Sequence, residues 1–240
     1  MSEKSVLLAV PHYGELAPEA LPGLAFPSLA GDVRVKIQTN GASLLAHNFN
    51  RLWCAALNQR RTLGLTHFAM HHADIGAEVG WLDTLLAEQA RVGADLLSVV
   101  VPIKDGRGVT STGWQDPITL DITRLTLQEI HDLPVTFRAE DLGRAAQPWL
   151  MVNTGLWICD FTQPWVEEAC FEVRDRIVRG GDGLYRANVL SEDWNFAGWC
   201  AGRGLKVFAT RAVSVGHFGR CCYRNDAPWG QWDHDRGDVC

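Results

Sequence analysis

The sequence lacks several signatures that would assign it to common protein classes. No Cys-x-x-Cys pair occurs, so its seven cysteines do not predict a structural zinc site. No Gly-x-Gly-x-x-Gly follows a predicted strand and no Gly-Lys-Ser/Thr loop is present, which argues against a dinucleotide-dependent oxidoreductase and a P-loop enzyme. Apolar runs stay shorter than the roughly 18 residues of a membrane span. With no signal-peptide pattern at the N-terminus, the sequence predicts a cytoplasmic protein.

The chain has little excess positive charge. Its net charge of −6 argues against a general nucleic-acid binder, which would carry a basic face. The 240 residues fit a single domain over 1–240, with an irregular polar tail from about residue 216. Three of the ten tryptophans lie among Gly, Pro and Asp, where an aromatic side chain often serves as a ligand platform: Trp114, Trp229 and Trp232. Trp81, Trp165 and Trp199 follow helical patterns and are expected to pack in the core.

Short apolar strands alternate with amphipathic helices along most of the chain. Strands are predicted near 6–10, 33–37, 66–70, 96–101, 149–152 and 205–209. Helices are predicted over about 43–60, about 80–90, after Ser191, and from Pro164 through an apolar stripe that ends at Ile177. This order predicts an α/β fold with a mainly parallel sheet flanked by helices. In such sheets ligands bind beyond the carboxyl ends of the strands.

Three short segments carry residues suited to chemistry. In His72-Ala73-Asp74, a carboxylate at a strand end could hold Mg²⁺ or Mn²⁺, although Asp74 could equally cap the following helix. In Ser191-Glu192-Asp193, the acids suit either a helix start or a general base. In Gly216-His217-Phe218-Gly219, the glycines would let the backbone approach a ligand, and His217 could ligate a metal.

The order of these segments resembles the GT-A family of nucleotide-sugar glycosyltransferases, in particular short bacterial and phage members related to cellulose and chitin synthases. His72-Ala73-Asp74 stands where that family has its Asp-x-Asp metal motif, with His72 in place of the first acid. Asn153-Thr154-Gly155 is similar to the turn that contacts the donor sugar, and Ser191-Glu192-Asp193 matches the motif of the catalytic base. The likeness runs from about Val6 to Gly219.

The resemblance implies a set of roles. Asp74 and His217 would bind Mn²⁺ or Mg²⁺, and Asp193, with Glu192 beside it, would accept the acceptor proton, with inversion preferred. The remaining positions implied to bind a UDP- or GDP-linked sugar are Pro11, His12, Tyr13, Asn50, Arg51, His72 and Gly155. The residues implied to meet the acceptor are Trp114, Lys104, Trp229 and Trp232.

Several alternatives stay open at this level. A nucleotide-sugar hydrolase would need the same residues, and a non-catalytic carbohydrate- or nucleotide-sugar-binding relative would retain the tryptophans. A sugar-phosphate nucleotidyltransferase is disfavoured, because Pro11-His12-Tyr13-Gly14-Glu15 is not a basic glycine-rich loop. The acceptor could be a glycan, a lipid-linked sugar, a protein or modified DNA.

Overall fold

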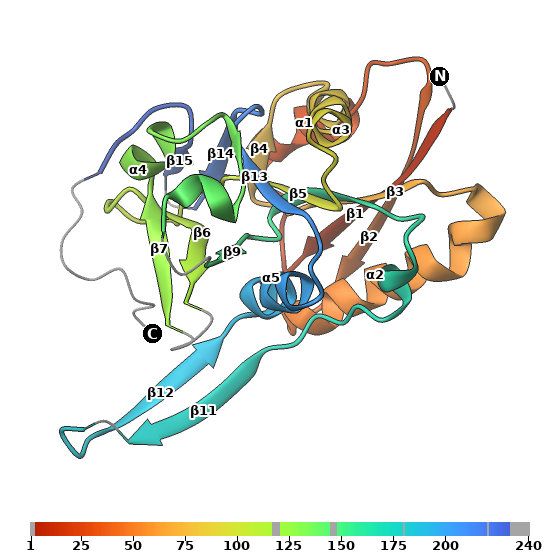
Figure 1. Ribbon diagram of the computed structural model, residues 1–240. Helices are drawn as coiled ribbons and strands as arrows, with labels where there is room; N and C mark the ends of the chain where they lie inside the picture. The colour runs from red at the N-terminus through yellow and green to blue at the C-terminus, as the bar shows by residue number, and fades with distance from the viewer. Residues whose placement is uncertain (1–2, 117–120, 145–147, 180, 220, 231–240) are drawn as a thin grey trace.

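The computed structural model describes residues 3–116, 121–144, 148–179, 181–219 and 221–230. Its centre is a seven-stranded sheet with the order β2-β1-β3-β10-β5-β13-β8 (Figure 1). Five strands run in one direction: β1 (Lys4–His12), β2 (Val33–Gly41), β3 (His67–His71), β5 (Leu96–Val99) and β13 (Val207–Thr210). β10 (Leu156–Asp160) and β8 (Thr136–Phe137) run in the opposite direction. The prediction of a mainly parallel α/β sheet is therefore confirmed.

Helices cover both faces of this sheet. α2 (Leu45–Leu63) and α5 (Glu192–Gly202) lie on one face, and α1 (Leu21–Ala25) and α3 (Trp81–Val92) on the other (Figure 1). Alternate side chains of β1 enter the two apolar layers, with Leu7 and Ala9 in the layer of α2 and α5, and Leu8 in the layer of α3. Burial on both faces explains why this strand is a continuous apolar run.

Trp53 on α2 is the centre of the larger apolar layer. Its indole is 1% exposed, lies 4.7 Å from the Phe68 ring, and donates a hydrogen bond to the Val166 carbonyl oxygen at 2.9 Å. We expect Trp53→Ala to lower the free energy of unfolding by about 3–5 kcal/mol, because it leaves a cavity and an unpaired carbonyl. Urea denaturation measures this change. Leu45→Ala, at a 40% exposed position of the same helix, should stay within about 0.5 kcal/mol of wild type; equal losses in the two variants would contradict this packing.

Two smaller sheets stand beside the main one. β4 (Ile75–Ala77), β14 (Val215–Phe218) and β15 (Cys222–Arg224) form one sheet in the order β15-β14-β4. β7 (Ile122–Thr126), β6 (Val109–Gln115) and β9 (Trp149–Met151) form the other in the order β7-β6-β9. Residues 215–224, expected to be irregular from about 216, thus contain two paired strands. α4 (Leu127–His131) begins at a capping box formed by Thr126 and Glu129.

The segment after Pro164 differs most from expectation. Helical structure there is a single 3₁₀ turn (Pro164–Glu167), and β11 (Arg174–Arg179) pairs with β12 (Tyr185–Leu190) in a hairpin that projects from the body (Figure 1). The predicted helix through Ile177 is wrong. The β-branched residues that formed its apolar stripe suit a strand, and Gly183, with φ of +81°, belongs to the hairpin turn.

Two further 3₁₀ segments span Pro18–Ala20 and Ala139–Leu142. Within the described ranges, no helix combines the length and apolarity needed to cross a membrane.

Candidate functional site

The candidate site forms where β3 ends. After His71 the chain turns through His72 and Asp74 and returns as β4, which pairs with β14, so that His217 lies opposite Ile75. The Phe218 amide donates a hydrogen bond to the Asp74 carbonyl oxygen at 2.8 Å. The loop after β5 supplies Lys104 from the same edge. Three segments that are distant in sequence therefore bring Asp74, Lys104 and His217 together.

Asp74 is the centre of this cluster. The Lys104 ammonium lies 2.5 Å from Asp74 Oδ2, and His217 Nε2 lies 3.4 Å from the same oxygen. Burial alone would raise the pKa of the Asp74 carboxyl, but the His217 ring and the Lys104 ammonium outweigh burial and hold that pKa well below its usual range. Asp74 is therefore an anion at every physiological pH.

Backbone contacts orient the two histidines. His217 Nδ1 lies 2.8 Å from the Pro102 carbonyl oxygen, and this hydrogen bond fixes the ring so that Nε2 points toward Asp74. Burial, offset only in part by the Asp74 carboxylate, lowers the pKa of His72 to about 4, so this ring is neutral at pH 7. His72 Nε2 is buried and has no hydrogen-bond partner among the described residues.

These donors suit a divalent cation. A carboxylate oxygen and an imidazole nitrogen lie 3.4 Å apart, and Mn²⁺ accepts both ligand types. The orphaned nitrogen of His72 adds a third candidate ligand. However, no group of three or more His, Cys, Asp or Glu side chains in the described ranges is arranged to hold a metal. The residues therefore fit a cation that takes two protein ligands and fills its other positions with ligand oxygens or water.

Lys104 pairs with the Asp74 carboxylate that would bind such a cation. We expect Lys104→Ala to tighten the binding of Mn²⁺ alone by about five- to tenfold, because the half-exposed ion pair that competes for Asp74 is worth about 1 kcal/mol. Isothermal titration without nucleotide measures the effect. Lys104→Arg keeps the charge and should leave the affinity near wild type. Weaker Mn²⁺ binding in Lys104→Ala would mean that Lys104 supports the cation site instead of competing for it.

The turn of Asn153 and Gly155 ties the strand ends together. Asn153 Nδ2 donates to the Val99 carbonyl oxygen at 2.7 Å, and Asn153 Oδ1 accepts from the Gly155 amide at 2.8 Å. The Gly155 carbonyl oxygen accepts from the His72 amide at 2.8 Å. A Cβ on Gly155 would lie 2.6 Å from Ile75 Cδ1. This turn positions His72, and a donor contact by Gly155 stays a prediction.

The glycines around His217 allow close packing of neighbouring side chains. A Cβ on Gly216 would lie 2.6 Å from Cys222 Sγ, and one on Gly219 would lie 3.0 Å from Lys104 Cδ. The space beside Gly219 is therefore filled by the stem of Lys104, which directs that ammonium toward Asp74. A ligand approach at these glycines stays a prediction.

The other predicted donor contacts are dispersed. Asn50 uses its amide to bind the backbone of Phe171, with hydrogen bonds of 2.7 and 2.9 Å, so it holds the chain against α2. Arg51 is exposed on α2. Pro11 and His12 are still part of β1, paired with β2, and Tyr13 beyond them is 79% exposed. His12 contacts the bare face of Gly41.

The two predicted acceptor tryptophans that the structure describes, Trp114 and Trp229, have different contacts. The Arg144 guanidinium lies 4.7 Å from the Trp114 ring centroid, and Trp114 packs against the larger apolar layer. Trp229 donates a hydrogen bond to the Arg224 carbonyl oxygen at 2.6 Å and stacks near Tyr223. Trp232 lies outside the described residues. Lys104, predicted in the same group, pairs with Asp74, and its contact with an acceptor stays a prediction.

Glu192 and Asp193 form the first turn of α5, as predicted. Asp193 Oδ1 accepts hydrogen bonds from the Ser191 hydroxyl and, at 2.7 Å, from the Trp194 amide, which orient its carboxylate. Burial, with the Asp193 carboxylate adding to it, raises the pKa of Glu192 to about 7. The two neighbouring acids therefore differ in environment, and Glu192 is partly protonated near neutral pH.

This raised pKa predicts a pH-dependent stability. Folding favours protonated Glu192, so its stabilising contribution is present below about pH 4.5 and is lost as pH rises through about 7. We compare the free energy of unfolding of Glu192→Gln with that of wild type. The difference should shift in favour of the variant by on the order of 3 kcal/mol between pH 4.5 and pH 8. Urea denaturation at both pH values measures the difference. Glu78→Gln, at an exposed position, controls for loss of a surface carboxylate. A constant difference between Glu192→Gln and wild type would refute the shift.

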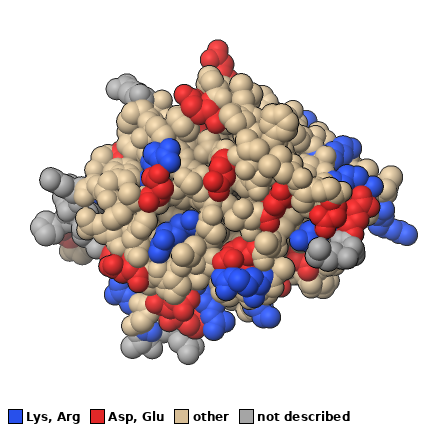
Figure 2. All heavy atoms as spheres, turned by 90° about the horizontal axis from the view of Figure 1, so that it is seen from above, with Lys and Arg blue, Asp and Glu red and all other residues tan. Residues whose placement is uncertain are grey.

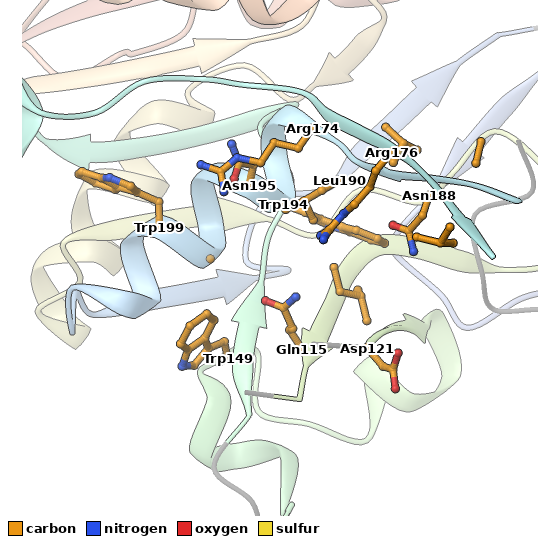
Figure 3. A pocket seen from close by; sticks show the side chains of 15 residues that line it. Gln115, Asp121, Trp149, Arg174, Arg176, Asn188, Leu190, Trp194, Asn195 and Trp199 are labelled. Carbon is orange, nitrogen blue, oxygen red and sulfur yellow. The ribbon is translucent and has the colours of Figure 1, made fainter. Parts of the chain in front are cut away.

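Trp194, the residue after Asp193, lines a groove of about 730 Å³. The sequence analysis missed it, because its walls come from the hairpin, α5 and the β7-β6-β9 sheet. Its lining includes Gln115, Asp121, Trp149, Arg174, Arg176, Asn188, Leu190, Trp194, Asn195 and Trp199 (Figure 3). Trp194 directly follows Glu192 and Asp193, and this adjacency was the one signal in the sequence.

Comparisons with known proteins identify the fold. No protein-family model matches the sequence, and no curated protein matches it. The crystal structure of A197 from STIV matches with a TM-score of 0.51 and 12% identity, over 98% of this chain and 97% of that one. The crystal structure of GalNAc-T7 with UDP, GalNAc and Mn²⁺ matches with a TM-score of 0.50 and 13% identity, over 95% of this chain and 45% of that one.

The chain therefore has a GT-A-like α/β fold. One structure of similar fold contains UDP and Mn²⁺. At these identities the likeness establishes the fold alone.

Proposed function

We propose that this protein is a metal-dependent glycosyltransferase that moves a sugar from a nucleoside-diphosphate sugar to an acceptor hydroxyl, with inversion. The observation that carries the proposal is the cluster of Asp74, His217 and Lys104 at the carboxyl edge of the sheet. In this kind of sheet that edge is where ligands bind.

The donor side of the reaction uses the Asp74 cluster. Asp74 and His217 would hold the divalent cation, with His72 close by. When bound, the cation supplies Lewis-acid stabilisation of the departing diphosphate. Lys104, once displaced from Asp74, would place its ammonium against a phosphate oxygen. The Pro102 carbonyl keeps His217 in the orientation that presents Nε2.

The acceptor side uses the start of α5. The acceptor oxygen forms the new bond to the anomeric carbon while the bond from that carbon to the diphosphate oxygen breaks. Asp193, oriented by Ser191 and the Trp194 amide, takes the acceptor proton. Glu192, partly protonated at neutral pH, is suited to donate a hydrogen bond. Two acids with different environments can divide such roles.

The experiment measures release of nucleoside diphosphate from UDP- and GDP-sugars with Mn²⁺, with and without a panel of saccharide acceptors. If the protein is a transferase, one acceptor should raise the release of nucleoside diphosphate many-fold. A glycosylated form of that acceptor should appear at the same time. Equal release with and without acceptors would identify a hydrolase. Nucleotide-sugar binding with no release would identify a non-catalytic relative and overturn the proposal.

The distribution of charge favours a small saccharide over nucleic acid as the acceptor. The net charge is −6, and on the face shown in Figure 2 acidic and basic side chains are interspersed. A continuous basic surface is the usual footprint of a nucleic-acid binder.

A further inference from the structure

The hairpin forms one wall of the groove and has two distinct faces. Side chains alternate along β11, so Arg174 and Arg176 lie on the groove side, opposite Leu190 and Asn188 of β12 (Figure 3). Ile177, on the other side, is 77% exposed. The basic face of the hairpin is therefore the one turned to the groove.

Arg176 is the uncommitted cation of this wall. Arg174 pairs with Glu172 at 3.2 Å, whereas the Arg176 side chain has no hydrogen bond or ion pair with any residue that the structure describes. Figure 3 shows its guanidinium directed into the groove. The Asn188 side chain beside it is likewise without a partner among the described residues. Two sets of free donors thus face one cavity, and a guanidinium binds phosphate or carboxylate with paired hydrogen bonds.

The opposite walls supply aromatic surface. Trp194 and Trp199 from α5 already hold guanidinium groups on their rings, from Arg124 at 4.2 Å and Arg203 at 3.9 Å. Trp149 on β9 makes no ring-to-ring or cation contact within the described ranges; it packs in part against the larger apolar layer and also lines the groove. An indole with an open face suits the C–H surface of a sugar ring.

We propose that this groove binds a saccharide acceptor that carries an anionic group, a phosphate or a carboxylate. The anion meets Arg176 and Asn188, the sugar ring packs on Trp149, and the acceptor hydroxyl reaches toward Asp193. The volume of about 730 Å³ lies in the usual range of small-molecule sites. Asp121 stands at the other side of the groove from Arg174 (Figure 3), which directs the anion toward the hairpin. The proposal rests on the transferase function above in naming the bound saccharide as acceptor.

Binding should also order the hairpin. Within the described residues β11 and β12 pair only with each other, and an isolated two-stranded hairpin is marginally stable in water. A ligand that joins Arg176 and Asn188 to Trp149 bridges the hairpin to the body. Amide hydrogen exchange over 174–190 should therefore slow in its presence.

The test uses the full chain without nucleotide or metal. Glucose, galactose and mannose, their 6-phosphates, their uronates and inorganic phosphate are titrated by calorimetry, with hydrogen exchange on the best ligand. We expect at least one phosphorylated or carboxylated sugar to bind at least tenfold more tightly than its neutral parent and than phosphate. The phosphate and uronate arms distinguish the two sources of charge.

Paired variants locate the contact. Arg176→Gln should abolish the tenfold preference, while Arg179→Gln, on the outer side of the same strand, should retain it. Trp149→Ala should weaken the binding of neutral and charged sugars to the same extent. No preference for any charged sugar, equal binding of phosphate, or equal effects of the two arginine substitutions would overturn the proposal.

The nucleotide assays separate this inference from the proposed function. If nucleotide binds with metal but no saccharide binds in the groove, the transferase proposal stands and the proposed anionic acceptor is wrong. Saccharide binding without nucleotide binding would leave a carbohydrate site and remove transfer.

Discussion

Asp74→Asn is expected to weaken Mn²⁺-dependent binding of nucleoside diphosphate by at least about 100-fold, and to reduce sugar transfer by at least as much. The substitution keeps the shape of the side chain but replaces an anion with a neutral amide. Both Lys104 and His217 then lose the carboxylate that they now share. Calorimetric titration of UDP and GDP in the presence of Mn²⁺ measures the first effect.

A matched substitution controls for the loss of an ion pair. Asp182→Asn removes a carboxylate from its pair with Arg186 at the hairpin tip and should leave nucleotide binding unchanged. Because surface ion pairs contribute about 0–1 kcal/mol, both variants should remain folded. Wild-type affinity for the metal–nucleotide pair in Asp74→Asn would remove Asp74 from the donor site.

Asp193→Asn is expected to lower turnover by about 10²–10⁴-fold with little change in nucleotide affinity, because it removes the proposed proton acceptor and keeps the donor site. Glu192→Gln should lower turnover less than about tenfold, since glutamine resembles the protonated acid that burial favours. Steady-state kinetics with a defined acceptor, together with nucleotide titrations, separate the two effects.

The relative loss of turnover in these two variants shows which acid is the general base. If Glu192→Gln proves as harmful as Asp193→Asn, and the lower limb of the pH profile near 7 disappears with it, then Glu192 accepts the proton. Loss of nucleotide binding in Asp193→Asn would instead place Asp193 in the donor site.

The sequence predicted the parallel part of the sheet better than its centre. The continuous apolar run of β1 and the amphipathic pattern of α2 have strong periodicity, and both elements formed as expected. β10 was missed, although Leu156 to Asp160 occupies the middle of the sheet. This short strand follows another strand and a turn, so the alternation of strands and helices does not predict it. Its antiparallel direction depends on pairing with β3, which lies far away in the sequence.

The candidate site was predictable in part for a related reason. Asp74 and His217 were identified from local motifs, and the structure brings them within 3.4 Å of each other. Lys104 was placed with the acceptor, because its position beside Asp74 depends on how the loop after β5 packs against Gly219. The groove could not be predicted, since the chain after Pro164 had the apolar spacing of a helix but forms a hairpin.

The most direct test of the account is the thermal stability of the wild-type protein with nucleoside diphosphates and nucleotide-sugars, with and without Mn²⁺ or Mg²⁺. A ligand that binds only the folded state, present at about 100 times its Kd, adds roughly 2.7 kcal/mol to the free energy of unfolding. The account predicts a rise in Tm with one nucleoside diphosphate that requires the metal and is lost in Asp74→Asn. No rise with any nucleotide, with or without metal, would contradict the proposed donor site.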